Sequence, residues 1–176
     1  MGNPSRGGGV EHSSYTTVFG SIDSFDKGGV ELINDDARHY AFSNMFEVAA
    51  NAKPWEKIAV AKNFEYVLEA IRAEGTSEWR TAAHDEFAVC MDGSVTVELV
   101  RLDTSPLASD AEGSIALDGE PQGARMGKAH LNRGHQVLLP AGAAYRFTAE
   151  KPSVLMMQTI AGPDTQFRWA EICQTV

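Results

Sequence analysis

The chain has 176 residues, 43% of them hydrophobic, which fits a single domain with a sizeable core. Its formal net charge of −9 and pI near 5.0 argue against nucleic-acid binding, which needs clustered Lys and Arg, and against a basic membrane-binding face. The sequence has neither the roughly 20 apolar residues of a membrane span nor an apolar run like that of a signal peptide near its start. We therefore expect a soluble cytoplasmic protein with no nucleic-acid or membrane partner.

Residues 1–54 are expected to form an extended N-terminal arm. Residues 1–9 are rich in Gly, Pro and Ser and are expected to be disordered. The rest of the arm carries six aromatic residues without a sustained period: Tyr15, Phe19, Phe25, Tyr40, Phe42 and Phe46. So many exposed aromatic side chains would favour aggregation, and we expect the arm to dock on the rest of this chain or on another subunit.

Residues 55–176 are predicted to form an all-β domain. Gly, Pro, Asp or Asn separate short apolar runs, which predict strands at 57–62, 65–74, 86–91, 94–102, 127–132, 136–141, 144–150 and 153–161. Val95, Val97 and Leu99 alternate with polar residues, as in a half-buried strand. The acidic stretch from Asp103 to Gly127 is expected to be a long connection.

A short helix is predicted at the C-terminal end of this domain. Asp164 is suited to an N-cap, and Phe167, Ala170 and Ile172 would share one apolar side. Cys90 lies in an apolar run without metal-ligand spacing, so we expect a buried thiol.

Two segments carry the spacing of a known barrel. Gly134, Pro140 and Gly142 match the second cupin motif, G-x5-P-x-G-x2-H-x3-N. Glu86 and Gly93 match the end of the first cupin motif, H-x-H-x3,4-E-x6-G. Gly93 and Gly142 would allow positive φ in tight turns. The chain thus resembles the cupins, and the resemblance implies a double-stranded β-helix, or jelly-roll barrel.

The match does not extend to the metal ligands. In cupins, two motif-one histidines, the motif-one glutamate and one motif-two histidine hold the metal. Other residues occupy the histidine positions of this chain: Arg80 and Ala82, or Trp79 and Thr81 under the longer spacing, and Tyr145. Only Glu86 remains, and a single carboxylate does not hold a divalent ion tightly. We predict that the barrel binds no metal.

One alternative metal site stays open. His84 lies two residues before Glu86, so both side chains would point to the same side of a strand. Together with His135 or His130 they would form an irregular site. The other interpretation is that these histidines are hydrogen-bonded or solvated at strand ends and turns.

A wider resemblance covers residues 40–173. The runs 40–99, 134–147 and 158–173 are similar to the small subunit of two-component hydroquinone 1,2-dioxygenases. This resemblance implies a small alpha subunit in an α2β2 heterotetramer with a larger catalytic cupin subunit. It also implies that the larger subunit holds Fe(II) and cleaves hydroquinone with O2 to 4-hydroxymuconic semialdehyde. No catalytic residue is then expected in this chain.

Three side chains are candidates for a substrate pocket or an interface: Trp79, Arg80 and Tyr145. Trp79 and Arg80 offer an aromatic or cationic wall for a phenolic ring. Trp79 and Tyr145 are equally explained as residues that fill the space of a lost metal and its substrate. Two other functions stay open: a self-sufficient homodimeric metal enzyme using His84, Glu86 and His135, or a metal-free cupin that binds a small molecule.

Overall fold

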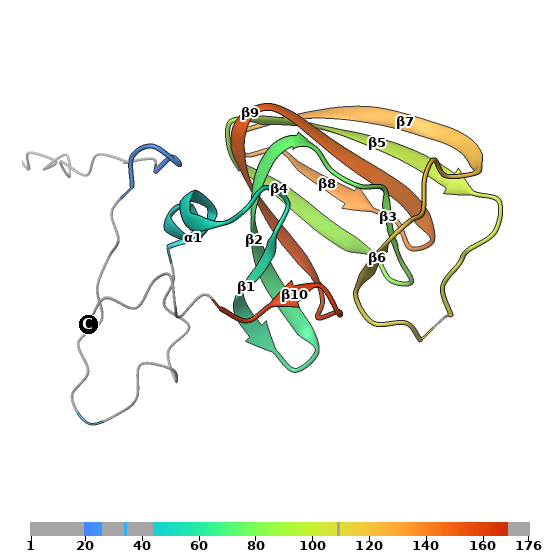
Figure 1. Ribbon diagram of the computed structural model, residues 1–176, viewed down its shortest axis with the longest axis horizontal. Coiled ribbons are helices and arrows are strands. Elements are labelled where there is room, and N and C mark those ends of the chain that lie inside the picture. Colours follow the sequence, from blue (N-terminus) through green and yellow to red (C-terminus); the bar gives the residue numbers. More distant parts are fainter. Residues whose placement is uncertain (1–19, 26–33, 35–43, 109, 169–176) are drawn as a thin grey trace, which may run out of the picture.

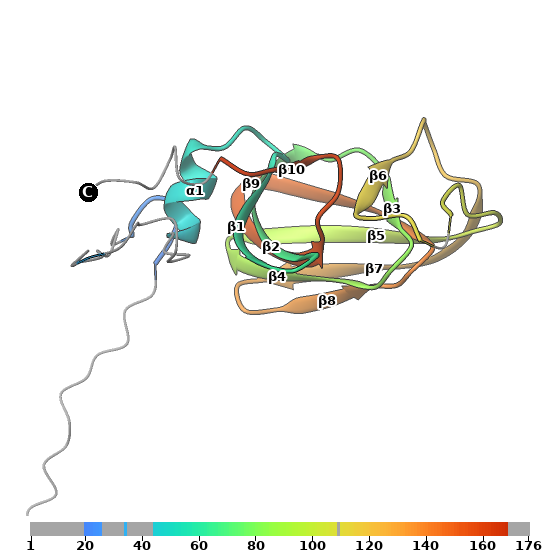
Figure 2. The ribbon, with the colours of Figure 1, turned by 90° about the horizontal axis from the view of Figure 1, so that it is seen from below.

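The computed structural model describes residues 20–25, 34, 44–108 and 110–168. These residues form one helix and ten strands: α1 (Met45–Asn51), β1 (Lys57–Asn63), β2 (Tyr66–Thr76), β3 (Arg80–Ala82), β4 (Glu86–Asp92), β5 (Ser94–Leu102), β6 (Ser114–Ala116), β7 (Gly123–Asn132), β8 (Gln136–Leu139), β9 (Ala143–Ile160) and β10 (Thr165–Gln166). The strands make one sheet that curls on itself, and α1 lies beside β1 and β2 at one end (Figures 1 and 2). The predicted all-β, cupin-type barrel is confirmed.

The long strand β9 pairs with four other strands. Its first part, Ala143 to Thr148, lies between β3 and β5, and its second part lies between β2 and β4. The register with β2 shifts between the two parts, around the exposed Pro152. The sequence predicts separate strands at 144–150 and 153–161, because Lys-Pro is a turn signal. The chain instead continues as one irregular strand, where a proline that lacks an N–H is tolerated.

Alternating residues of the strands fill the barrel interior. The main core cluster draws on β2, β4, β5, β7, β8 and β9, with Ile71, Ala73, Ala88, Cys90, Val95, Val97, Leu131, Leu139, Tyr145, Phe147, Ala149, Leu155 and Met157. Leu99 packs against this cluster, which confirms the alternation predicted for 94–102. Cys90 is a buried free thiol, as expected.

The helix α1 lies in the segment expected to be extended. Its N-cap is Asn44, whose Oδ1 accepts the backbone N–H groups of Phe46 and Glu47 at 3.0 and 3.2 Å. Its buried Val48 packs with Ile58 of β1 in a second apolar cluster. This part of the arm therefore docks on its own barrel.

A second described piece of the arm, residues 20–25, also contacts the barrel. The backbone N–H of Ile22 donates to Asp92 Oδ2 at 2.9 Å, and Arg133 donates to the other oxygen of that carboxylate. Four of the six arm aromatics lie outside the described residues: Tyr15, Phe19, Tyr40 and Phe42.

Two turns confirm the conformations expected from the motif glycines. Gly93 has φ of 75° between β4 and β5, and Gly142 has φ of 71° before β9. A side chain on Gly93 would also collide with Ser153, because a Cβ there would lie 2.2 Å from the Ser153 Oγ. The glycine of the first motif is therefore required both by its backbone angle and by the packing of β9.

The helix predicted to begin at Asp164 is not found at residues 164–168, so the prediction is wrong for these residues. Thr165–Gln166 instead form β10, which adds in parallel to β1. The Thr165 hydroxyl donates to the buried Glu69 at 2.7 Å, a bond that fixes this segment against the sheet. The rest of the predicted helix, from residue 169, lies outside the described residues. In the described part of the chain, no helix is long and apolar enough to cross a membrane.

Candidate functional site

The one cupin ligand retained in the sequence, Glu86, is fully buried, and each of its carboxylate oxygens accepts a hydrogen bond. It opens β4 with its side chain inside the barrel, where the Tyr145 hydroxyl donates to Oε2 and the Thr159 hydroxyl donates to Oε1, both at 2.6 Å. Burial, followed by the negative charge of Glu86, raises the pKa of Tyr145 well above its ordinary value of 10.0. The phenol therefore stays protonated and acts as a donor to the carboxylate.

His84 reaches this group only through Thr159. Its Nε2 lies 2.9 Å from Thr159 Oγ1 and 3.2 Å from the backbone nitrogen of Ile160. Nε2 is thus engaged by protein atoms, whereas Nδ1 is buried without a hydrogen-bond partner among the described residues. We call these four residues the Glu86 cluster: His84, Glu86, Tyr145 and Thr159.

The structure does not bring together the alternative metal ligands His84, Glu86 and His135. His135 lies in the turn between β7 and β8, where its Nδ1 accepts the backbone N–H of Asn132 at 2.9 Å and its carbonyl oxygen accepts from Cys90. Cys90 is four residues along β4 from Glu86, which corresponds to roughly 13 Å. His135 is distant from Glu86 because the turn that carries it, between β7 and β8, lies at the other end of the β4–β8 ladder.

The other candidate, His130, does not reach Glu86 either. It is exposed on β7, and its Nδ1 lies 2.9 Å from the hydroxyl of Thr96 on β5. Across the described residues, no group of three or more His, Cys, Asp or Glu side chains is arranged to hold a metal ion. The Glu86 cluster itself does not fit an iron ion, since both oxygens of its carboxylate are already bonded to hydroxyl groups and it contains one histidine, whose Nε2 is engaged by Thr159 and Ile160.

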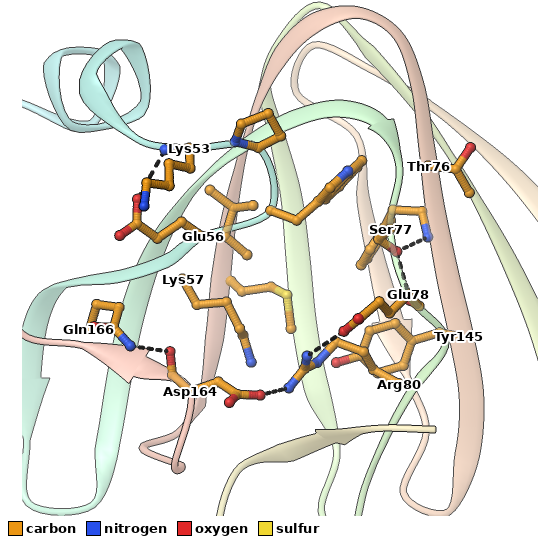
Figure 3. A pocket seen from close by; sticks show the side chains of 15 residues that line it. Lys53, Glu56, Lys57, Thr76, Ser77, Glu78, Arg80, Tyr145, Asp164 and Gln166 are labelled. Carbon is orange, nitrogen blue, oxygen red and sulfur yellow. Dashed lines mark hydrogen bonds and ion pairs between the residues drawn. The ribbon is translucent and has the colours of Figure 1, made fainter. Parts of the chain in front are cut away.

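A cavity of about 540 Å³ opens beside the Glu86 cluster (Figure 3). Its wall comes from β1, β2, β3, β9, β10 and three connecting segments, with Lys53, Pro54, Trp55, Glu56, Lys57, Ile71, Thr76, Ser77, Glu78, Arg80, Tyr145, Phe147, Met157, Asp164 and Gln166. Two of the three sequence candidates, Arg80 and Tyr145, lie on this wall. Its volume is in the range of ordinary small-molecule pockets.

The buried Lys57 and the partly buried Arg80 belong to the polar part of the cavity wall. Lys57 Nζ lies 3.4 Å from Glu69 Oε2 and donates to Ser114 Oγ at 2.8 Å. Arg80 donates from Nε to the same hydroxyl at 3.1 Å and forms an ion pair with Asp164 (Figure 3). Because Ser114 joins both cations, the short strand β6 fixes the geometry of this end of the cavity.

The third candidate, Trp79, lies away from the cavity and packs on the outer side of β5 and β9. Its indole N–H donates to Glu120 at 3.0 Å, and the Arg146 guanidinium stacks over its ring at 4.4 Å. Arg146 and Lys128 both pair with Glu98 at 2.8 Å, and these two partners lower the pKa of Glu98 from 4.5 to about 2. In this chain Trp79 is part of a surface network that covers the sheet.

Several residues of the site were not singled out by the motifs: Trp55, Lys57, Glu69, Ser114 and Thr159. Two of them can be recognised in the sequence from their position in the alternation of a strand. Glu69 alternates with Val67 and Ile71, and Thr159 alternates with Leu155 and Met157, so each is a polar residue on an inward-facing row. Such residues need a buried partner, which identifies them as members of a polar cluster.

Comparisons with known proteins give two close structural relatives. One is a chain of the crystal structure of hydroquinone 1,2-dioxygenase PnpCD in complex with Cd2+ and 4-hydroxybenzonitrile. It is 54% identical, with a TM-score of 0.86 over 93% of this chain and 99% of that chain. The other belongs to hydroquinone 1,2-dioxygenase from Sphingomonas sp. TTNP3 with 4-hydroxybenzoate bound. It is also 54% identical, with a TM-score of 0.87 over 92% of this chain and 98% of that chain.

A second kind of chain also matches this one. In PnpCD in complex with Fe3+, a chain with 12% identity and a TM-score of 0.58 aligns with 79% of this chain but only 38% of its own length. That likeness shows a shared fold between this chain and a much longer one. No protein-family model and no curated protein matches the sequence. Because it is 54% identical to both close relatives over more than nine-tenths of each chain, the chain belongs to the family of short cupin-type chains of hydroquinone 1,2-dioxygenases.

Proposed function

We propose that this chain is the metal-free small subunit of a heteromeric, Fe(II)-dependent hydroquinone 1,2-dioxygenase. The larger cupin subunit would hold the iron and convert hydroquinone and O2 to 4-hydroxymuconic semialdehyde, in a cytoplasmic α2β2 assembly. Both atoms of O2 enter that product, so the reaction needs no external reductant. This chain would contribute stability and surface to the assembly.

The observation that carries the proposal is the state of Glu86. Tyr145 occupies the position of the second-motif histidine, and its hydroxyl bonds to the carboxylate that would otherwise bind a metal. Thr159 donates to the other carboxylate oxygen. A carboxylate with both oxygens engaged and no convergent imidazoles is a structural element of the core and a poor ligand for Fe(II).

An exposed apolar row on the outer face of the sheet supports a protein partner. Phe87 of β4 pairs with Leu138 of β8 on one side and with Gln158 of β9 on the other, and Gln158 pairs with Leu68 of β2. Phe87 and Leu138 are 46% and 44% exposed, and Val89 beside them is half-buried. Adjacent exposed apolar side chains such as Phe87 and Leu138 are typical of an interaction surface. We assign it to the larger subunit.

The three candidate side chains take different roles in this proposal. Arg80 lies on the cavity wall and forms an ion pair with the half-exposed Asp164, so it is the candidate most easily reached by a partner or a ligand. Trp79 covers the outer face of the sheet, and Tyr145 fills the barrel beside Glu86. We therefore retain Arg80 as a contact residue and treat the other two as packing residues.

The test is the iron content of the full chain, purified alone, incubated anaerobically with excess Fe(II) and desalted. We expect iron near zero, whereas the same procedure on the two subunits purified together should retain it. Ring cleavage should require both subunits. Iron close to one per chain in the small subunit alone would overturn the proposal, as would failure of the two subunits to co-purify.

A further inference from the structure

The hairpin between β1 and β2 turns through a phenylalanine in a conformation that suits glycine. Asn63 pairs with Tyr66, so Phe64 and Glu65 form a two-residue turn. Phe64 has φ of 56°, and it is the one residue of this turn with a positive φ. In two-residue hairpin turns, a positive φ at the first position alone is normally taken by glycine, because a Cβ there clashes with the backbone. The turn itself therefore does not favour a phenylalanine.

Packing within the described part of the chain does not favour Phe64 either. Its side chain is 83% exposed, and that of Tyr66, two residues further on, is 50% exposed. Figure 1 shows the tip of this hairpin at the lower edge of the barrel, where both aromatic side chains meet solvent. A residue that breaks a local backbone rule without a compensating contact is expected to have a functional role. Exposed aromatic side chains are typical anchors of protein interfaces, so we look for a protein partner.

The charges on either side of the phenylalanine indicate which partner fits. Lys62 lies two residues before Phe64, and Glu65 directly follows it. Both charged residues are exposed, and the Nζ of Lys62 lies 5.1 Å from the centroid of the Phe167 ring. When two copies of this hairpin meet about a two-fold axis at Phe64, Lys62 of each copy can pair with Glu65 of the other. A tip with one cation and one anion around an aromatic ring is thus complementary to itself.

The hairpin tip is a different surface from the apolar row that we assign to the larger subunit. That row includes Phe87 of β4 and Leu138 of β8. In the sheet, β4 is separated from β1 by β9 and β2. One copy of the chain therefore has room for the larger subunit at Phe87 and for a second small chain at Phe64.

We propose that the tip of the β1–β2 hairpin, residues 62–66, is a two-fold contact between two copies of this chain. The two Phe64 rings pack against each other at the axis, and Lys62 and Glu65 form ion pairs across it. The inference rests on the proposed function, because this contact would join two pairs of small and larger subunit into the α2β2 assembly.

The test measures the mass of the co-purified complex of both subunits over a dilution series. Phe64→Gly should still co-purify with the larger subunit, but its pairs should associate at least about tenfold more weakly than wild-type pairs. The Tm of the small chain alone should not fall, because glycine suits the φ of 56°. An assembly unchanged by Phe64→Gly would overturn the proposal. Loss of co-purification would assign the tip to the larger subunit and overturn it as well.

Failure of the proposed function gives a different result from failure of this inference. If the wild-type subunits do not co-purify, the proposed function is wrong. The inference is then decided by the self-association of the small chain alone: a dimer that Phe64→Gly weakens would support it, and a wild-type monomer would overturn it.

Charge reversal distinguishes a contact between identical tips from other roles of these residues. Lys62→Glu and Glu65→Lys should each weaken the association of the pairs, because like charges then face each other across the axis. The two substitutions together restore opposite charges and should return the association towards that of the wild type. Glu150→Lys and Lys151→Glu, at exposed residues of β9, are the matched controls and should leave it unchanged. A double variant that associates no better than either single variant would overturn the two-fold contact.

Discussion

Replacing Tyr145 by Phe removes one hydroxyl from the Glu86 cluster and leaves the ring in place. The lost bond is 2.6 Å long, fully buried and made to a carboxylate, and it is one of two hydroxyl bonds that satisfy this group. Hydrogen bonds to charged groups contribute about 1.5–3 kcal/mol, and a buried acceptor left unpaired adds to the loss. We therefore expect Tyr145→Phe to lower the free energy of unfolding by about 2–3 kcal/mol. For a chain of this length, that corresponds to about 5–10 °C in Tm.

Urea unfolding at pH 7 measures this loss, and Tyr66→Phe is the matched control. Tyr66 is half-exposed on β2, so the same chemical change there should cost less than about 0.5 kcal/mol. Combining Tyr145→Phe with Glu86→Gln in a double-mutant cycle should give a loss smaller than the sum of the single losses. Equal effects of Tyr145→Phe and Tyr66→Phe would refute the stabilising role assigned to the hydrogen bond between Tyr145 and Glu86.

Three further predictions test separate parts of the structure. Glu98 has its pKa lowered from 4.5 to about 2, so its stabilising effect is complete above pH 4.5 and lost as the pH falls to 2. Glu98→Gln should thus cost about 1 kcal/mol at pH 7, after allowance for solvent screening, and flatten the acid unfolding curve in that window. Gly93→Ala should be more destabilising in urea than Gly142→Ala, because both glycines have positive φ but only Gly93 has a neighbour where the Cβ would go; equal losses would contradict this packing argument. Phe87→Lys should abolish co-purification with the larger subunit and leave Tm nearly unchanged, while Phe64→Lys, at another exposed aromatic, should preserve the complex.

The sequence predicts the parts of this fold that depend on local spacing. The glycines at 93 and 142 adopt the positive φ that their motif positions require, and the alternation of Val95 and Val97 places both residues in the core. The strand β10 and the continuity of β9 are not predicted, because each depends on pairing with distant strands. Thr165 follows a good N-cap residue, yet its bond to the buried Glu69 draws this segment into the sheet.

Local spacing likewise predicts some residues of the candidate site and misses others. The motif spacing identifies Glu86 and shows that Tyr145 stands at the histidine position, and the structure joins the two directly. The second partner, Thr159, lies 73 residues further along the chain and belongs to no motif. Its contact with Glu86 depends on the pairing of β4 with the second part of β9, which no local pattern contains.

Glu86 illustrates how protein donors can satisfy a buried carboxylate at a cupin ligand position. A carboxylate at a fully buried position of β4 requires donors whether or not a metal is bound. Tyr145 and Thr159 supply these donors, so Glu86 stabilises the core only together with them. Removing one of the three side chains leaves a buried polar group without its partner. A histidine at position 145 alone would remove the tyrosine bond without supplying the other imidazole ligands of the cupin motifs.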